Sequence, residues 1–371
     1  MRAYVLTDAA LTKQAGRFAW LTIDSEKSKN TAFVEKFPVD AWPMFLVIDP
    51  KTEKALLKWN GSATAPQLGR LLDDGERAFK GGGNGPEAAL ARADRLNGEG
   101  KPAEAARAYR ETIQAAGSKW PGRERAAESL VMTWQLAENP EECARAAVEM
   151  APTLPLGPSF LNIVGSGLDC AMDDEKAEWA VRAIAKLKPL AEEAVRLPDQ
   201  LADDRAGLYD TLLGVYTEQK DDAAATKLIA EFAAFLDNHE KTAPNVEARA
   251  SLDSYRTSLA IRMKDPAWAI PSLQATERDL PNDYNPPARL ASLYAEMERY
   301  DEALAASDRA LAKVYGPRRI QVFSTRASIY EKKGDKAAAR ATLADAIKLA
   351  SSQPKDERQL AALKKQLDRL Q

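Results

Sequence analysis

From residue 86 to the end, the chain carries the pattern of amphipathic helices and little else. Apolar residues recur every three or four positions in segments of a dozen or more residues, and glycine, proline and Asn-Pro breaks separate these segments. Because the segments come in pairs with short connections, we predict about six helical hairpins and a final helix. The predicted pairs ahead of residue 284 are 87–97 with 103–115, 123–136 with 140–150, 159–172 with 175–196, 201–219 with 223–238, and 246–263 with 268–278.

Residues 284–353 contain the clearest internal repeat. Two hairpins share a 36-residue period, with small residues where the two helices of each hairpin cross. One such hairpin cannot bury its own apolar face, so neighbouring hairpins must stack. The pattern resembles the tetratricopeptide repeat. The residues that recur at this period are Tyr294 and Tyr330, Ala303 and Ala339, and Ala310 and Ala346.

The first 80 residues have a different, mixed pattern. Asn30 is the predicted N-cap of a short helix that Pro38 ends, and two later strands separated by a short turn predict an antiparallel hairpin. The predicted elements are a helix at 1–14, a buried strand at 18–24, a helix at 30–37, strands at 44–48 and 55–59, and a helix at 66–72.

This order of elements resembles the second part of the thioredoxin fold. Residues 18–24 look like the strand that follows the family's active-site helix, and Trp42-Pro43 looks like the approach to its cis-proline. The resemblance implies that Trp42 and Pro43 shape a substrate groove and that the Pro43 peptide bond is cis.

The chain departs from that family at the redox site. No cysteine lies within residues 1–80, and the strand that leads into the family's Cys-x-x-Cys motif is absent. As given, the chain therefore cannot exchange disulfides through this region. Two explanations stay open. We favour a chain that begins downstream of its natural start, because the rest of the pattern is kept; the alternative is a degenerate adaptor whose strands pair directly.

The expected fold class is an α/β thioredoxin-like N-terminal domain followed by an all-α solenoid of the tetratricopeptide type. Four glycines in five residues predict a flexible linker between the two parts. The expected parts are an N-terminally truncated domain at 1–80, the linker at 81–85, helical repeats at 86–353 (clearest at 86–118 and 284–353), and a capping helix at 354–371.

Composition and charge exclude several classes of protein. Hydrophobic residues make up 45% of the chain, which argues against global disorder, and the net charge of -3 argues against a nucleic-acid or anionic-membrane partner. No apolar stretch is long enough to span a bilayer, and residues 1–20 lack a signal-peptide pattern. We expect a cytoplasmic protein as given, or a periplasmic or secreted one if an upstream extension carries a signal peptide.

Residues suited to catalysis or metal binding are few. Cys143 and Cys170 lie 27 residues apart, which fits neither a redox motif nor a zinc site, so we expect them to be buried small residues. The single histidine, His239, lies among charged residues near a helix end and is expected at the surface. We predict no metal, no cofactor and no catalytic residue in this chain.

Repeats of this type generally bind proteins or peptides in a groove lined by the first helix of each hairpin. The clamp of lysine and asparagine that holds a peptide carboxylate in some family members is not reproduced at Leu90, Asp94, Ala288 or Ser324. We therefore do not predict that ligand. The candidate contacts for a protein partner are Arg92, Arg95, Arg289, Ser292, Arg326 and Ser328.

Two functions of different classes remain. In the first, the repeats bind a protein partner, and the N-terminal domain, if an upstream Cys-x-x-Cys completes it, performs thiol–disulfide exchange. In the alternative, the chain is a redox-inactive adaptor or assembly scaffold that acts only through protein–protein interaction. An upstream Cys-x-x-Cys in the same reading frame would favour the first.

Overall fold

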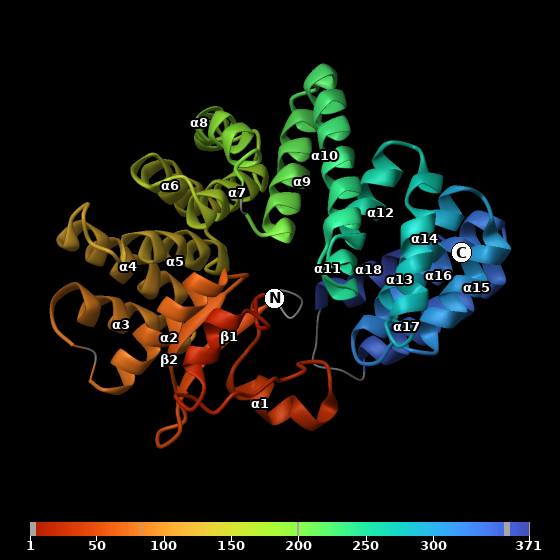
Figure 1. Cartoon of the computed structure of the whole chain (residues 1–371). Helices are drawn as coiled ribbons and strands as arrows, with labels where there is room; N and C mark the ends of the chain where they lie inside the picture. The colour runs from red at the N-terminus through yellow and green to blue at the C-terminus, as the bar shows by residue number, and fades with distance from the viewer. Residues whose placement is uncertain (1–4, 82, 199, 352–356, 371) are drawn as a thin grey trace. The chain divides into compact units, whose positions relative to one another are not determined.

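The computed structural model describes residues 5–81, 83–198, 200–351 and 357–370 (Figure 1). The described chain is mostly helical, with one small sheet. The N-terminal elements are η1 (Ala9–Gln14), η2 (Ser28–Asn30), α1 (Thr31–Lys36), β1 (Met44–Asp49), β2 (Lys54–Asn60) and α2 (Ala65–Phe79).

The remaining helices follow as pairs. The pairs of the first half are α3 (Gly85–Gly98) and α4 (Pro102–Ala116), α5 (Arg123–Leu136) and α6 (Pro140–Met150), α7 (Pro158–Met172) and α8 (Glu178–Ala194), and α9 (Ala202–Glu218) and α10 (Asp222–Thr242). Those that follow are α12 (Asp253–Arg262) and α13 (Ile270–Asp279), α14 (Asn285–Glu296) and α15 (Tyr300–Leu311), and α16 (Arg318–Lys333) and α17 (Lys336–Ser351). Three short elements lie between pairs or their helices, η3 (Ala151–Thr153), α11 (Val246–Ala250) and η4 (Pro266–Trp268), and α18 (Glu357–Asp368) comes last.

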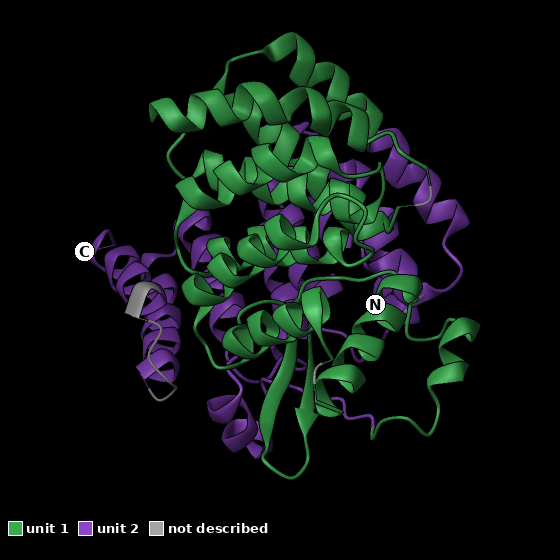
Figure 2. Ribbon diagram, turned by 90° about the vertical axis from the view of Figure 1, so that its left-hand side faces the viewer, with its two compact units in different colours: residues 1–19, 39–232 green, residues 20–38, 233–371 purple. Residues whose placement is uncertain are grey.

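The chain divides into two compact units (Figure 2). The first contains Met1–Ala19 and Val39–Phe232, and the second contains Trp20–Pro38 and Ala233–Gln371. Residues 20–38, which include α1, therefore belong with the C-terminal repeats although the segments on either side belong with the N-terminal repeats. The glycine-rich stretch at 81–85 lies within the first unit.

A shared backbone turn joins the helices of six pairs. One residue adopts the left-handed conformation, and the N–H of the next residue donates back to a carbonyl in the last turn of the first helix, as from Arg299 N to Tyr294 O at 2.9 Å. Five positions after the left-handed residue, a small side chain lies in the first turn of the second helix, or just before it at Ala269. In five of these pairs the small side chain is fully buried. The left-handed residues are Gly100, Glu138, Lys220, Lys264, Glu298 and Gly334, and the fully buried small residues are Ala105, Cys143, Ala269, Ala303 and Ala339.

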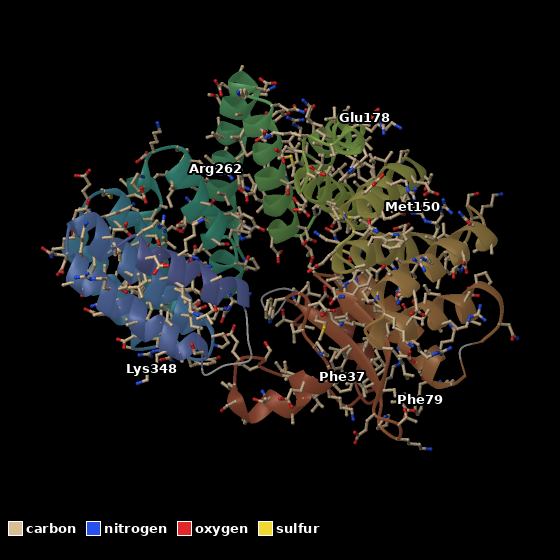
Figure 3. The ribbon with its side chains drawn as sticks, turned by 180° about the vertical axis from the view of Figure 1, so that it is seen from behind. Phe37, Phe79, Met150, Glu178, Arg262 and Lys348 are labelled. Atoms are coloured by element: carbon tan, nitrogen blue, oxygen red, sulfur yellow. A yellow bond between two sulfur atoms is a disulfide. The ribbon has the colours of Figure 1, made fainter. Side chains whose placement is uncertain are left out.

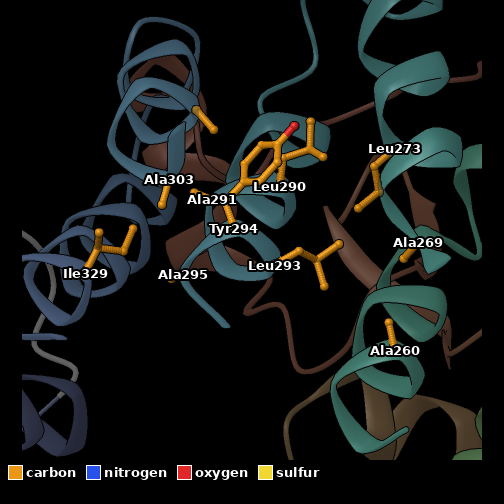
Figure 4. Packing of buried hydrophobic residues seen from close by; sticks show 11 residues of the cluster. Ala260, Ala269, Leu273, Leu290, Ala291, Leu293, Tyr294, Ala295, Ala303 and Ile329 are labelled. Carbon is orange, nitrogen blue, oxygen red and sulfur yellow. The ribbon is translucent and has the colours of Figure 1, made fainter. Parts of the chain in front are cut away.

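Stacking of the pairs forms the core of each unit, and side chains fill the space between the helices (Figure 3). The first helices pack on one another, α5 on α7 and α7 on α9 in the first unit, and α12 on α14 and α14 on α16 in the second. We call these the inner helices. Figure 4 shows the result around α14, where Leu293 faces the helices that carry Ala260 and Leu273, while Ile329 lies on the opposite side. The predicted helical-repeat solenoid is thus confirmed as a fold.

The final helix, α18, packs against the last hairpin. Leu363 of α18, and Leu370 just after it, are buried in a cluster with Leu343 and Ala346 of α17. The apolar face that the last hairpin would otherwise expose is covered in this way.

The N-terminal sheet is a two-stranded antiparallel hairpin, as predicted. Phe45 lies opposite Trp59 and Val47 opposite Leu57. Helix α2 covers the hairpin so closely that a Cβ on its Gly75 would lie 2.6 Å from Val47, and a capping box of Thr64 and Gln67 fixes the start of α2.

Other predictions for this region are wrong. Residues 18–24 form no strand: Trp20 and Leu21 are 50% and 77% exposed. A strand needs a neighbour to receive its backbone hydrogen bonds, and the described sheet offers none for this segment. The helix at 1–14 is reduced to the 3-10 turn η1, with residues 1–4 outside the described chain. Asn30 does precede α1, but its side chain donates to the Asp24 carbonyl at 2.8 Å instead of capping the helix.

The thioredoxin-like domain predicted for residues 1–80 is not shown. The peptide bond between Trp42 and Pro43 is cis, as the resemblance implied. However, the described sheet has two strands only, and η1 replaces the expected active-site helix.

The turn geometry predicts which substitutions stabilise the second unit. Glu298 holds φ 59°, a conformation that costs a non-glycine residue roughly 1–2 kcal/mol. We expect Glu298→Gly to raise the free energy of unfolding by about 0.5–1 kcal/mol once the extra chain entropy of glycine is subtracted. Urea denaturation measures this. The matched control is Gly334→Ala at φ 87°, for which we expect a loss of at least about 1 kcal/mol; a stabilising Gly334→Ala would contradict the explanation.

Candidate functional site: the inner helices

The inner helices of the first unit are joined by a buried polar cluster. Asp94 on α3 accepts a hydrogen bond from the Tyr109 hydroxyl at 2.6 Å and from Arg125 Nη2 on α5 at 2.8 Å to each carboxylate oxygen. Burial raises the pKa of Asp94, and Arg125 opposes that shift; burial also raises the pKa of Tyr109 well above its usual range. Asp94 and Tyr109 are thus fully engaged and serve to join one hairpin to the next.

The β-hairpin and α2 pack against the same inner helices. Strand β2 and α2 contact α3. From α2, Asp74 lies 3.3 Å from Arg125 Nε on α5, and Gln67 donates to the Ser159 hydroxyl on α7 at 3.2 Å. Ser62 donates to Asp204 at the start of α9. The N-terminal module therefore contacts four successive inner helices of its unit.

Asp204 is an ionisable group with an unusual environment. Burial raises its pKa to about 7, with smaller contributions from the negative charges of Asp203 and Glu128, while the hydrogen bond from Ser62 acts in the opposite direction. The carboxyl is therefore partly protonated at neutral pH, at the junction between the hairpin and α9.

The first-unit candidates from the sequence lie apart from this junction. Arg92 is exposed on α3 and Arg95 is half-buried one turn later. Trp42 is 64% exposed before β1, and the Pro43 carbonyl accepts from Gly61 N–H at 2.8 Å.

Two of the second-unit candidates make contacts within that unit. Arg326 Nη1 lies 2.7 Å from Asp308, and its guanidinium is stacked over Tyr330, with 5.3 Å to the ring centroid. The Ser328 hydroxyl accepts from Gln366 of α18 at 3.0 Å. Both side chains help to hold neighbouring helices together.

Arg289 and Ser292, the remaining candidates, line the same pocket. It has a volume of about 240 Å³ and lies among α14, α15 and α16. The sequence prediction did not include the lining residues from α15 and the N-terminal part of α16, because only the packing of these helices on α14 brings them to the pocket. The lining is Tyr284, Asn285, Ala288, Arg289, Ala291, Ser292, Ser307, Arg318, Gln321, Val322 and Thr325.

Two acidic residues, Asp253 and Asp283, act electrostatically on Arg289. Burial lowers the pKa of Arg289, while the charges of Asp253 on α12 and Asp283 oppose that shift. Burial raises the pKa of Asp253 to about 6, against the attraction of Arg289. Both shifts have the same cause, since each group has lost much of its hydration.

The segment from Trp20 to Pro38 reaches the edge of this pocket. The Tyr315 hydroxyl donates to Asp24 at 2.6 Å, and Glu26 accepts from Arg318 Nε at 2.7 Å. The hydrogen bond to Asp24 raises the pKa of Tyr315 to about 12. Gly316 allows the close approach, because a Cβ there would lie 2.8 Å from the Glu26 carbonyl oxygen. No periodic or motif signal in the sequence indicates this docking.

The two cysteines are buried, as predicted, but they are not separate residues. Cys143 on α6 and Cys170 on α7 form a disulfide, with 6.1 Å between their Cα atoms. The prediction missed the bond because spacing along the chain does not show that packing of α6 on α7 brings these two positions together.

His239 is half-buried and not at the open surface as expected. Its Nε2 lies 2.9 Å from the Ala248 carbonyl oxygen, and its ring stacks on Phe235, with 6.4 Å between centroids. Within the described ranges, no cluster of histidine, cysteine and acidic side chains is arranged to hold a metal ion. Among the described helices, none is long and apolar enough to cross a bilayer.

Comparisons with known proteins agree with this architecture. No model of a protein family matches the chain, and no curated protein matches it. Among solved structures, a tetratricopeptide repeat protein from Parabacteroides merdae is similar, with a TM-score of 0.50, 12% identity, and coverage of 77% of this chain and 98% of that one. This similarity shows a tetratricopeptide-type helical solenoid.

Two further solved structures match at lower TM-scores. The hetero-tetramer Cut9–Hcn1 of APC/C matches with a TM-score of 0.41 and 13% identity, over 75% of this chain and 48% of that one. Acl4, an assembly chaperone of RpL4, matches with a TM-score of 0.40 and 14% identity, over 77% and 98%.

The environment of Asp204 predicts how pH affects stability. A pKa of about 7 in the folded chain, against 3.8 as the ordinary value, means that the folded state binds the proton more tightly. The resulting stabilisation is complete below the ordinary value and is lost as pH rises through about 7. We expect the urea concentration at the midpoint of unfolding to depend less on pH in Asp204→Asn than in the wild type, between about pH 5 and about pH 8.

The control for this prediction is Asp222→Asn, an exposed aspartate in the first turn of α10. It should leave the pH dependence unchanged. Asp253 titrates in the same range, so part of the wild-type slope should persist in Asp204→Asn. An unaltered slope in Asp204→Asn would show that this carboxyl does not bind the extra proton.

Proposed function

We propose that this protein is a redox-inactive scaffold whose inner helices bind a protein partner. The observation that carries the proposal is the pocketed inner face of the second unit, where Arg289 and Ser292 line a cavity within a solenoid of the tetratricopeptide type. Solenoids present extended surfaces of this kind to other proteins.

Thiol–disulfide exchange has little support. The sequence contains two cysteines, and both form one buried disulfide between helices α6 and α7. Neither sulfur is therefore an exposed thiolate of the kind that attacks a substrate disulfide. The β-hairpin and α2 instead serve as a module that contacts the inner helices of the first unit.

We assign the contacts with the partner protein to side chains in each unit that are at least partly exposed or line the pocket. Arg289 and Ser292 line the pocket, Arg92 and Arg95 lie on α3, and the exposed Trp42 supplies an aromatic contact. Aromatic and arginine side chains are enriched at protein interfaces.

Site-specific photo-crosslinking in the native cells tests this function. A benzoylphenylalanine at Gln321, exposed on inner helix α16, should give a covalent adduct with a second protein. The matched position is Arg340, exposed on α17 in the same hairpin, and it should give none. Adducts of equal yield at both positions, or at neither, would refute binding by the inner face.

We also propose that the chain folds in an oxidising compartment, outside the cytosol. A buried disulfide between two packed helices is typical of proteins from such compartments. The stabilisation expected from a disulfide is roughly 2–4 kcal/mol, and it is present only if the bond forms.

The oxidation state of the protein from its native cells tests the compartment. Alkylation of the denatured chain without a reductant should leave its mass unchanged, because both thiols are blocked. Alkylation after reduction should add two alkyl groups, one each at Cys143 and Cys170, which serves as the internal control. Two alkyl groups added without reduction would place the chain in a reducing compartment.

A further inference from the structure

The pocket among α14, α15 and α16 is lined by cationic and hydrogen-bonding side chains. Its lining contains two arginines, Arg289 and Arg318, and no carboxylate. The other polar residues of the lining are hydroxyl and amide side chains, together with Tyr284. A pocket with cationic and hydroxyl donors favours an anionic ligand, because each donor gains a charge-assisted hydrogen bond.

The guanidinium of Arg289 has N–H donors that are not used within the described chain. It makes no hydrogen bond or ion pair with any residue in the described part of the chain. Its nearest acids, Asp253 and Asp283, act on it through space and oppose the effect of burial. A guanidinium has five N–H donors in a planar fork, which matches the two oxygens of a carboxylate.

Ser307 provides an independent indication of a ligand. It comes from α15, its exposed fraction is 1%, and it lines the pocket. Its Oγ has no hydrogen-bond partner among the described residues. A buried hydroxyl without a partner has lost its hydrogen bonds to water, and a ligand oxygen in the pocket would replace them.

The chain itself already places an acidic side chain at the edge of this pocket. Glu26 accepts from Arg318 Nε at 2.7 Å, and Asp24 accepts from Tyr315 at 2.6 Å. Both acids belong to the segment from Trp20 to Pro38, which has only η2 and the short helix α1 as regular structure. The surface around the pocket therefore accommodates an acidic segment of polypeptide.

We propose that the pocket receives an aspartate or glutamate side chain from an acidic segment of the partner protein. Arg289 donates to the carboxylate, and Ser292 and Ser307 complete its hydrogen bonding, while Glu26 keeps Arg318 occupied at the edge. This inference rests on the proposed function, since it names the chemistry of the partner that the inner face binds.

Fluorescence anisotropy with the full chain tests the proposal. The probe is a fluorescein-labelled octapeptide that alternates glutamate with glycine, and the comparison peptide has glutamine in place of glutamate. We expect the wild type to bind the glutamate peptide at least about tenfold more tightly, equivalent to about 1.4 kcal/mol. Equal affinity for the two peptides, or no binding of either, would overturn the proposal.

Matched variants locate the binding in the pocket. Arg289→Gln should weaken binding of the glutamate peptide by about tenfold, whereas Arg278→Gln, the same change at an exposed site on α13, should alter it by less than about twofold. Equal losses in both variants would mean general charge attraction and would refute the pocket.

A second variant covers the case in which Arg289→Gln unfolds. Ser292→Glu adds a resident carboxylate at a half-buried lining position and should abolish peptide binding while the circular dichroism spectrum is kept. Undiminished binding by Ser292→Glu would refute the pocket. A partner adduct at Gln321 together with failed peptide binding would overturn the acidic preference alone, whereas the absence of that adduct would overturn the proposed function.

Discussion

The close packing of two helices in hairpins such as α3–α4, α14–α15 and α16–α17 is the constraint on which this structure depends. Five of the hairpins carry a fully buried alanine or cysteine at or just before the start of the second helix, and a small residue there lets the two backbones approach closely. The left-handed turn before it sets the direction in which the second helix leaves. Stacking then packs neighbouring pairs together, α5 on α7 and α7 on α9 in the first unit, and α12 on α14 and α14 on α16 in the second.

That inner layer is partly covered by the protein's own N-terminal segments. In the first unit, β2 and α2 pack on α3, while Asp74, Gln67 and Ser62 reach α5, α7 and α9. In the second unit, Asp24 and Glu26 engage Tyr315 and Arg318. The N-terminal residues therefore act less as a separate domain than as two sets of contacts, one for each unit. The pocket beside Arg289 is a part of the inner surface where a cation keeps unused donors.

Elements that depend on the local sequence pattern can be predicted from the sequence. Features that depend on contacts between residues far apart along the chain cannot. Helices α5 and α6 begin and end at the predicted residues, because amphipathic spacing, Asn139-Pro140 and the left-handed turn are all local signals. The strand at 18–24 fails because strand formation requires a neighbour. The disulfide and Ser307 were missed because they depend on which helices become adjacent, whereas Arg289 and Ser292 could be placed on an inner helix because inner-helix positions follow from the repeat; both line the pocket, and their role in partner binding stays a prediction.

The docking of residues 20–38 has a consequence for biosynthesis. Asp24 and its partner Tyr315 are separated by 291 residues. At synthesis rates of roughly 5–20 residues per second, Asp24 exists for about 15–60 s before Tyr315 is made. Once residue 232 has been made, late in that interval, the first unit can already assemble around the hairpin and α2. Until Tyr315 is made, the nascent chain therefore holds an undocked loop bearing Trp20 and Leu21.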